Sequence, residues 1–275
     1  MKQLVSLLAG GLVAVSVSAQ ATDITGAGAS FPAPVYAKWA EAYKAETGVA
    51  MNYQAIGSGG GVKQINTKTV DFGASDDPVS GEQLEKDGLV QFPAVIGGIV
   101  PVLNVAGVQP GQLKLDGKLL ADIFRGEVKT WNDPAIAAKN PDLELPSTAI
   151  TIVYRSDSSG TTAAFTSYLA EVSPEFKATV RSGKTVNWPT GLGGRGNAGV
   201  AANVAKLKGS LGYVEYAYAK QNELTHAAMV NRAGEVVQPD EKSFAAAAAN
   251  ADWTASPGFG VNLNNQAGDA AWPIT

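Results

Sequence analysis

The chain has 275 residues, 45% of them hydrophobic, which is enough for one large domain or two lobes with packed cores. Its 25 acidic and 21 basic residues give a net charge of −4, which argues against a basic surface for nucleic acid and means that any anion site must be local. Cysteine is absent, so disulfides cannot contribute to stability.

The first 21 residues have the pattern of a secretory signal peptide. Lys2 precedes an apolar run that ends in the small-residue triplet 19–21. This run is too short, and too interrupted by Gly and Ser, to be expected to span a bilayer, and no later segment offers roughly 18 consecutive apolar residues. We therefore expect cleavage after Ala21 and a soluble, exported mature protein.

Two loops of small residues near the N-terminus lead into expected helices. Residues 26–31 precede a helix whose first turn contains prolines, which are tolerated there because those positions lack intrahelical acceptors. The glycine-rich residues 57–61 follow a strand pattern and precede the next helix. Ser30, Phe31 and Ser58 are therefore expected near helix N-termini, where unpaired N–H groups and the helix dipole favour an anion.

A carboxylate follows the next strand pattern. Residues 70–75 have the composition of a buried strand that ends at Asp76, and Ser80 opens a capping box for another helix. This β-α-β-α order predicts a mostly parallel sheet, whose ligands lie beyond the carboxyl ends of its strands. Asp76 is therefore expected at the same site as the helix starts.

A lobe boundary is expected in the middle of the chain. The apolar residues 89–104 are interrupted by prolines and glycines, which suggests two strand pieces with a crossover between them. A second α/β unit follows, with a helix near residues 118–124. We expect lobe one at residues 22–103 and lobe two at residues 104–265.

The most informative stretch, residues 154–162, ends a strand and begins a helix near Ser159. Arg155 offers a planar fork of donors matched to a tetrahedral oxyanion, and Asp157 could hold that fork in register. Gly160 would let a ligand approach the backbone. An ordinary capped helix with a surface Arg–Asp pair is the alternative, but the other helix starts favour an anion site.

Other motifs carry less weight. Residues 191–196 match the dinucleotide fingerprint G-x-G-x-x-G, with Glu215 about where an acidic ribose ligand would lie, but glycine-rich loops often match by chance and an exported protein meets little free NAD. His226 is the only histidine and is expected at the surface. Without a nucleophile elbow or a Cys/His cluster, the sequence predicts no catalytic residue, no metal and no cofactor.

Four separated motifs resemble those of the periplasmic phosphate-binding proteins of ABC-type phosphate uptake systems. The motifs are Gly26–Pro34, Gly57–Gly61, Asp71–Asp76 and Ser159–Thr161. The resemblance implies an α/β fold of two lobes, a type II periplasmic binding protein of clamshell shape with the ligand cleft between the lobes. It also implies that one buried phosphate contacts Ser30, Phe31, Ser58, Asp76, Arg155, Ser159, Gly160 and Thr161, with Asp157 pairing with Arg155.

The resemblance further implies what the protein does. We expect high-affinity binding of inorganic phosphate in the periplasm and delivery to an ABC-type membrane permease, by a monomer that is not an enzyme and binds no nucleic acid. One alternative is a binding protein for another oxyanion, such as sulfate or molybdate. A less favoured alternative is a secreted phosphatase that uses the same cradle for a substrate phosphate.

This sequence departs from the family pattern in two places. The family usually has Thr where Ser30 stands, so the hydroxyl is kept and a methyl group is lost. The family also continues beyond Thr275, so we expect residues 266–275 to begin the return to lobe one. Without the remainder, the sheet of lobe one would keep an open edge.

Overall fold

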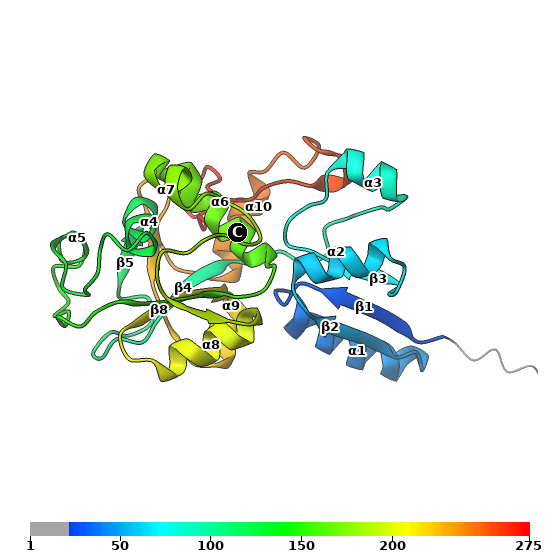
Figure 1. Cartoon of the computed structure of the whole chain (residues 1–275), viewed down its shortest axis with the longest axis horizontal. Coiled ribbons are helices and arrows are strands. Elements are labelled where there is room, and N and C mark those ends of the chain that lie inside the picture. The colour runs from blue at the N-terminus through cyan, green and yellow to red at the C-terminus, as the bar shows by residue number, and fades with distance from the viewer. Residues whose placement is uncertain (1–21) are drawn as a thin grey trace, which may run out of the picture.

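The computed structural model describes residues 22–275, and the expected signal peptide at residues 1–21 lies outside the described residues. Two α/β lobes lie side by side, the smaller carrying β1 to β3 and the larger carrying the later strands (Figure 1). No helix in the described part of the chain is long and apolar enough to cross a membrane.

Lobe one is built on a three-stranded parallel sheet in the order β2-β1-β3. Its aromatic side chains pack on one another, with the rings of Tyr53 and Phe72 stacked at 5.8 Å and Tyr36 edge-on to Tyr53 at 5.0 Å. The elements of this lobe are β1 (Ile24–Gly28), α1 (Ala33–Thr47), β2 (Met51–Ala55), α2 (Ser58–Asn66), β3 (Phe72–Ala74) and α3 (Gly81–Asp87).

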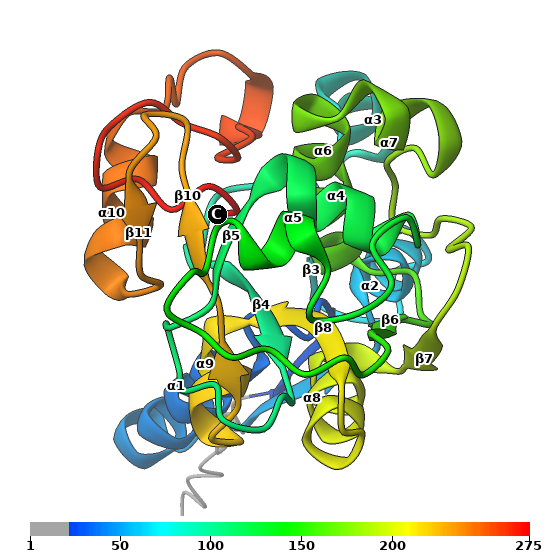
Figure 2. The ribbon, with the colours of Figure 1, turned by 90° about the vertical axis from the view of Figure 1, so that its left-hand side faces the viewer.

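Lobe two is built on a five-stranded mixed sheet in the order β7-β6-β8-β4-β9 and a smaller sheet in the order β11-β10-β5 (Figure 2). Its strands are β4 (Ile99–Leu103), β5 (Lys114–Asp116), β6 (Thr151–Arg155), β7 (Leu192–Gly194), β8 (Ser210–Glu215), β9 (Thr225–His226), β10 (Ala228–Val230) and β11 (Val236–Val237). Its helices are α4 (Gly117–Phe124), α5 (Pro134–Ala137), α6 (Gly160–Val172), α7 (Pro174–Thr179), α8 (Gly196–Lys206), α9 (Tyr216–Gln221), α10 (Glu241–Ala249) and the 3-10 turn Pro257–Phe259.

The central strands of lobe two are buried along their whole length, so they are hydrophobic runs rather than alternating patterns. Tyr213 of β8 stacks on Phe165 of α6 with ring centroids 4.2 Å apart. Trp131 is fully buried and its indole N–H donates to the carbonyl of Gly209, which satisfies its polar atom inside the core. This core fixes the end of β6 and the start of α6, which carry the arginine motif.

The crossover between the lobes lies earlier than the sequence predicts. Residues 89–98 form no strand, and β4 pairs antiparallel with β8 in the large sheet. Pro93 cannot donate to a strand ladder, which explains in part why this apolar segment stays irregular. The boundary expected after residue 103 is therefore displaced, because the strand before it belongs to the sheet of lobe two.

The last residues pack at the junction of the lobes. Trp272 is fully buried, and its indole N–H donates to the carbonyl of Ile99 at 3.0 Å. Ile99 in turn donates its N–H to the carbonyl of Ile274 at 2.8 Å. The expected return of this segment to lobe one stays a prediction.

His226 was expected at the surface. Its side chain is instead half-buried in β9, and its ring meets that of Tyr216 edge-on, with the ring centroids 5.9 Å apart.

Candidate functional site

The loops that the sequence singled out face one another across the two lobes. The Gly160 N–H of lobe two donates to Ser58 Oγ of lobe one at 3.1 Å. The Thr161 hydroxyl donates to Asp76 Oδ2 at 3.1 Å. Segments separated by about a hundred residues are thus brought into hydrogen-bond contact, and the strand ends and helix starts converge as predicted for a parallel sheet.

Arg155 is the most tightly held charged group of this site. Its side chain is 1% exposed, and its Nε and Nη2 donate to the two carboxylate oxygens of Asp157 at 2.8 and 2.6 Å. Nη1 donates to Thr161 Oγ1 at 3.2 Å. The guanidinium has further N–H groups beyond these three, so the Asp157 pair holds the fork in place and leaves donors for an anion.

Asp157 is ionised in this setting. Burial opposes its charge, but the hydrogen bonds and charge of Arg155 and an N–H from Gly196 at 2.9 Å outweigh burial and hold the pKa of Asp157 below its usual range. The alternative of an ordinary surface Arg–Asp pair is therefore wrong, because both side chains are largely buried.

The N-terminus of α6 places its first N–H groups at the contact from lobe two, where protein groups accept from those of Ser159, Gly160 and Thr162. Ser159 is the N-cap, and its Oγ accepts from the Thr162 N–H at 3.0 Å. The Ser159 N–H donates to the carbonyl of Lys184 at 2.9 Å, which anchors the start of the helix. Ser159, Gly160 and Thr161 are all buried, so the positive end of the helix dipole lies in a poorly hydrated place.

Lobe one contributes hydroxyl groups and a helix start. Ser30 and Ser58 are 4% and 0% exposed, and both hydroxyls reach the contact between the lobes. Phe31 stands beside Ser30 just before α1, partly buried between the site and the core. Among the described residues, no protein acceptor is found for the Phe31 N–H.

Asp76 is the carboxylate that lobe one brings to the converging donors. Burial raises its pKa to about 6, although the charge of Arg155 and the hydrogen bond from Thr161 act in the opposite direction. It can therefore accept a proton more readily than an exposed carboxylate. At the edge of the site, Lys184 of lobe two and Asp77 of lobe one form an ion pair, with Nζ and Oδ2 2.9 Å apart.

The glycines of the motifs allow the lobes to approach closely. A Cβ on Gly160 would lie 2.4 Å from Ser58 Oγ and 2.7 Å from the Cβ of Asp76. A Cβ on Gly59 would lie 2.2 Å from Ser158 Oγ. Gly160, expected to let a ligand approach the backbone, also lets Ser58 and Asp76 of the opposite lobe approach it.

Sequence reasoning missed several residues that build the site from lobe two. Asn197 donates to Ser30 Oγ, and the Tyr218 hydroxyl donates to the carbonyl of Ser30 at 2.7 Å. Tyr213 bonds Thr162 and accepts from the Arg155 N–H. Asn197 directly follows the glycine-rich residues 191–196, and no local pattern in the sequence indicates its contact with Ser30.

Glu215, considered above as a ribose ligand, has another position. It ends β8 and its Oε2 caps α9 by accepting from the Ala217 N–H at 2.9 Å. Burial raises its pKa to about 7, with the charge of Asp76 adding to the effect. Its carboxyl is thus a structural cap near the site.

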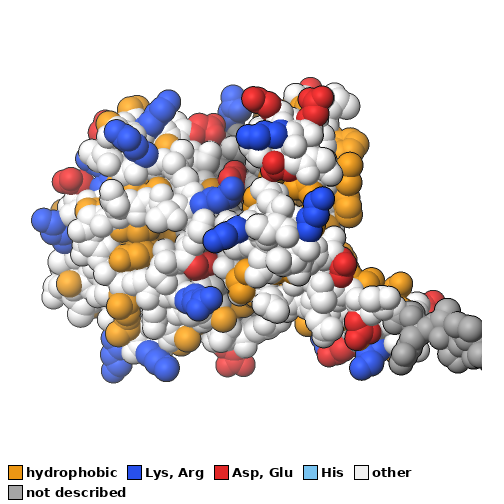
Figure 3. Space-filling model, turned by 45° about the vertical axis from the view of Figure 1, so that its right-hand side comes forward, with side chains coloured by type: hydrophobic (Ala, Val, Ile, Leu, Met, Phe, Trp, Pro, Cys, Tyr) orange, Lys and Arg blue, Asp and Glu red, His pale blue; other side chains and the backbone are white. Residues whose placement is uncertain are grey.

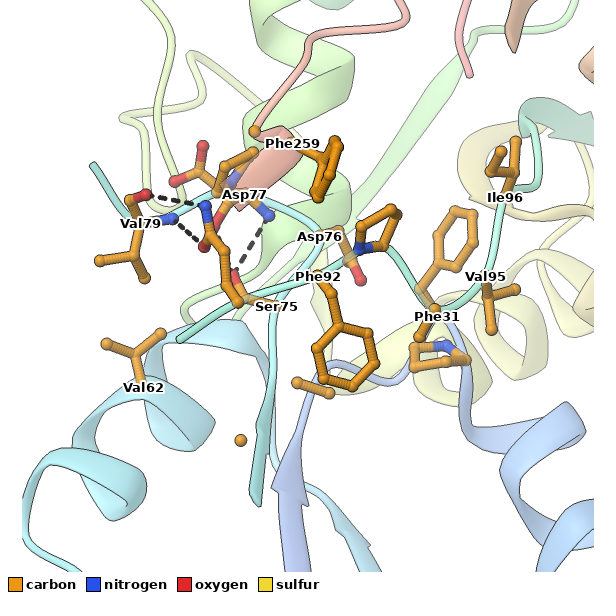
Figure 4. Close-up of a pocket in the computed structure, with 18 of the residues that line it drawn as sticks. Phe31, Val62, Ser75, Asp76, Asp77, Val79, Phe92, Val95, Ile96 and Phe259 are labelled. Carbon is orange, nitrogen blue, oxygen red and sulfur yellow. Dashed lines mark hydrogen bonds between the residues drawn. The ribbon is translucent and has the colours of Figure 1, made fainter. Parts of the chain in front are cut away.

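A large apolar cavity of about 780 Å³ adjoins the site on lobe one. Phe31 and Asp76 lie where it meets the donors, and Val95, Ile96 and Phe92 line it (Figure 4). Hydrophobic side chains are exposed on this flank of lobe one (Figure 3), and Val90 and Phe92 have the largest exposed fractions, 92% and 75%. The apolar side chains that line most of this cavity offer no hydrogen bonds to an oxyanion, whereas the converging donors beside it can.

Within residues 22–275, no group of three His, Cys, Asp or Glu side chains is placed to hold a metal ion. The groups that converge are hydroxyls, backbone N–H groups, the Arg155 guanidinium paired with Asp157, and the carboxylate of Asp76. Such a set can surround a small oxyanion with donors while offering one acceptor.

Comparisons with known proteins agree with this geometry. Residues 14–262 match the PBP superfamily domain. The chain is 59% identical to the phosphate-binding protein PstS of Pasteurella multocida over 94% of this chain and 76% of that protein. It is also 59% identical to the phosphate-binding protein PstS of Haemophilus influenzae, over 94% of this chain and 77% of that protein.

Solved structures show the same fold. A phosphate ABC transporter substrate-binding protein of Clostridium perfringens, solved with bound phosphate, superposes with a TM-score of 0.60 at 20% identity, covering 75% of each chain. The two-lobed α/β fold predicted from the sequence is therefore confirmed.

Proposed function

Because the chain belongs to the PBP superfamily and, within it, to the family of phosphate-binding proteins, we propose that it binds inorganic phosphate between its lobes and delivers it to an ABC-type permease for import. The likeness to the relatives covers almost the whole described chain. The recognition made from four motifs is thereby confirmed.

The observation that carries the proposal is the convergence of buried donors from both lobes on one place. Arg155 and the α6 N-terminus come from lobe two, and the hydroxyls of Ser30 and Ser58 come from lobe one. Neither lobe supplies the set alone. We propose that Ser30, Phe31, Ser58, Asp76, Arg155, Ser159, Gly160 and Thr161 contact the ion, with Asp157 holding Arg155.

The mechanism is capture without chemistry. Closure of two domains around a ligand is a general property of periplasmic binding proteins. The close approach at Gly59 and Gly160 shows how little space separates the lobes in the arrangement described here. In a dry, enclosed site each donor interacts more strongly with the anion than it would in water.

Asp76 gives the site its preference among oxyanions. Its carboxylate repels an anion unless that anion brings a proton to donate. Phosphate near neutral pH carries such a proton and sulfate does not, so sulfate would place lone pairs against lone pairs in a desolvated site. The donors alone cannot distinguish the two ions.

The remaining assignments follow from the family and are part of the proposal. We infer that residues 1–21 are removed on export, that the protein acts in the periplasm as a monomer, and that it catalyses no reaction. The two lobes are expected at residues 22–98 and 99–265, which moves the boundary to the start of β4 because β4 pairs with β8.

Titration calorimetry tests the proposal directly. The mature protein should bind phosphate tightly at one site and should bind sulfate and molybdate far more weakly at matched pH and salt. Preferential binding of sulfate or molybdate would make this a receptor for that ion instead. Turnover of a chromogenic phosphoester by the purified protein would favour the phosphatase alternative.

A further inference from the structure

A buried asparagine, Asn197, links the two lobes at the cradle. It lies in the first turn of α8 in lobe two and is 0% exposed. It is not among the residues assigned above to contact the ion. Its backbone N–H and its side-chain Nδ2 both donate to Ser30 Oγ, at 3.1 and 3.0 Å.

The orientation of the Asn197 carboxamide is determined by a backbone donor. Its Oδ1 accepts from the Glu215 N–H at 3.0 Å, and only the oxygen of the carboxamide can accept. The Nδ2 group must therefore face the opposite way, toward Ser30 and toward Thr161 Oγ1, which lies at 3.4 Å.

These bonds decide what the Ser30 hydroxyl can offer to a ligand. A serine hydroxyl has one hydrogen to donate and two lone pairs to accept with. Asn197 supplies a donor to each lone pair. The hydrogen is what remains, so the hydroxyl can meet an oxyanion as a donor and does not present a lone pair to it.

The second hydroxyl of lobe one shows the same arrangement built from backbone. Ser58 Oγ accepts from the Asp76 N–H at 3.2 Å and from the Gly160 N–H at 3.1 Å. Its hydrogen is likewise left over. The hydroxyls of Ser30 and Ser58 could each accept or donate, but their lone pairs are already occupied. Main-chain N–H groups occupy those of Ser58 and Asn197 occupies those of Ser30, so each hydroxyl can only donate to a ligand.

We propose that Asn197 is a positioning residue that makes the Ser30 hydroxyl a hydrogen-bond donor to the bound oxyanion when the lobes close. The inference rests on the proposed function, because it concerns the same anion site. Ser30 lacks the methyl group that would restrict the side-chain rotamer of a threonine, so Asn197 supplies the orientation. Because the two residues belong to different lobes, the donor is completed only on closure.

The role of Asn197 differs from that of Asp76. A donor strengthens binding of every oxyanion that offers lone pairs, so loss of Asn197 weakens phosphate and sulfate binding alike. Loss of Asp76 changes the ratio of the two affinities. Asn197 therefore contributes to affinity through Ser30 and leaves the ion preference unchanged.

The test is calorimetry of phosphate with wild type, Asn197→Ala, Ser30→Ala and the double variant at matched pH and salt. Asn197→Ala should weaken binding by about tenfold, the usual effect of losing a hydrogen bond that serves a charged ligand. In the Ser30→Ala background the same change should cost less than about twofold, because the hydroxyl that Asn197 orients is gone.

Asn197→Asp provides a second variant of nearly identical shape. Its carboxylate still accepts from the Glu215 N–H, but it would also accept the Ser30 hydrogen and turn it away from the ion, so affinity should fall further than in Asn197→Ala. Asn203→Ala removes an asparagine from the same helix away from Ser30 and is expected to bind as wild type. Thermal unfolding without ligand verifies that each variant folds.

If Asn197→Ala also weakens binding by about tenfold in the Ser30→Ala background, the two residues act independently and the inference is overturned. Unchanged binding by folded Asn197→Ala or Asn197→Asp would overturn it as well. If wild type itself fails to bind phosphate, the proposed function is wrong and this inference fails with it. Wild-type binding together with non-additive variants supports both.

Discussion

Lobe two holds its part of the site on a large core, and lobe one holds its part on a small one. Arg155 and α6 rest on strands that are buried throughout, with Tyr213 stacked on Phe165 beneath them. In lobe one the buried hydrophobic cluster consists of Ala29, Tyr36 and Ala74, around which partly buried side chains pack.

The difference suggests that the two lobes contribute different functions to the site. The charge that we propose attracts the anion is held by the larger lobe, where Asp157 and Thr161 bond Arg155. The side chains that we propose select and enclose the anion, Asp76 and Ser30, come from the smaller lobe, and their hydrogen bonds cross the contact. Each prediction below alters one side of this comparison or the contact between the sides.

The largest effect is expected from Arg155→Lys in lobe two. Lysine keeps the charge but loses the planar fork, and it leaves Asp157 with a poorly matched partner. Phosphate affinity should fall by about a hundredfold, the scale of losing charge-assisted hydrogen bonds in a buried site. Calorimetry measures it, and Arg232→Lys, an exposed position, is the control. Unaltered affinity in folded Arg155→Lys would remove the arginine from the site.

Asp76→Asn tests the selective role of lobe one. The carboxamide offers a donor where the carboxylate offers only lone pairs, so sulfate should be admitted while phosphate binding is harmed much less. The ratio of phosphate to sulfate affinity should fall by about thirtyfold, which corresponds to the cost of one mismatched charged acceptor. Competition calorimetry gives the ratio. A folded variant that still excludes sulfate completely would contradict the proton-acceptor argument.

Gly59→Ala tests the contact between the lobes. The added Cβ would lie 2.2 Å from Ser158 Oγ and 2.7 Å from its Cβ, so the lobes cannot approach as they do here. Alanine is a better helix former than glycine, so α2 itself should not lose stability. We expect about a tenfold loss of phosphate affinity, similar to losing one cross-lobe hydrogen bond to a charged ligand.

The matched rescue for this substitution is Ser158→Gly in the same protein, which removes the side chain that the new methyl group meets. Affinity should return toward the wild-type value. A double variant that binds as weakly as Gly59→Ala would mean that the contact between these two positions does not limit closure.

The smallest effect is expected from Glu215→Gln at the end of β8. Because burial raises the pKa of Glu215 from 4.5 to about 7, the folded chain keeps a proton that the unfolded chain releases, and the free energy of unfolding falls as pH rises through this window. The Gln variant should be more stable than wild type above pH 7, by about 1 kcal/mol after the weaker cap on α9 is counted.

Chemical unfolding of the ligand-free protein at about pH 4.5 and pH 8 measures this difference. The advantage of Glu215→Gln should be present at the higher pH and vanish at the lower one, where the wild-type side chain is protonated in the folded state. Equal stability differences at both values would show that the carboxyl is not buried in the way described.

Local patterns in the sequence were sufficient to predict most of the elements, whereas the full set of proposed contacts came from the resemblance to a known family. Proline at a helix start, glycine-rich loops after strand patterns, and the hydroxyl residues of 159–162 each depend on the backbone chemistry of a few neighbouring residues. The helix expected near 118–124 is confirmed by α4. The Arg155–Asp157 pair was predictable because the two residues are only two positions apart, at the end of one strand.

Long-range contacts were beyond the reach of such patterns. Residues 89–98 have strand-like composition and form none, because strand formation requires a partner that composition does not specify. The strand β4 joined the larger sheet through β8, more than a hundred residues away. Pairing of that kind is decided by the packing of the whole lobe.

The sequence by itself determined that hydroxyls, an arginine and a carboxylate stand at strand ends and helix starts, since those features depend on residues adjacent in the chain. Only the tertiary structure decided that Gly160 makes room for Ser58 and that Asn197 commits the Ser30 hydroxyl to donation. The physical reason is that a hydroxyl or an amide takes its role from whichever partner lies within hydrogen-bond distance, and in this protein that partner comes from the other lobe.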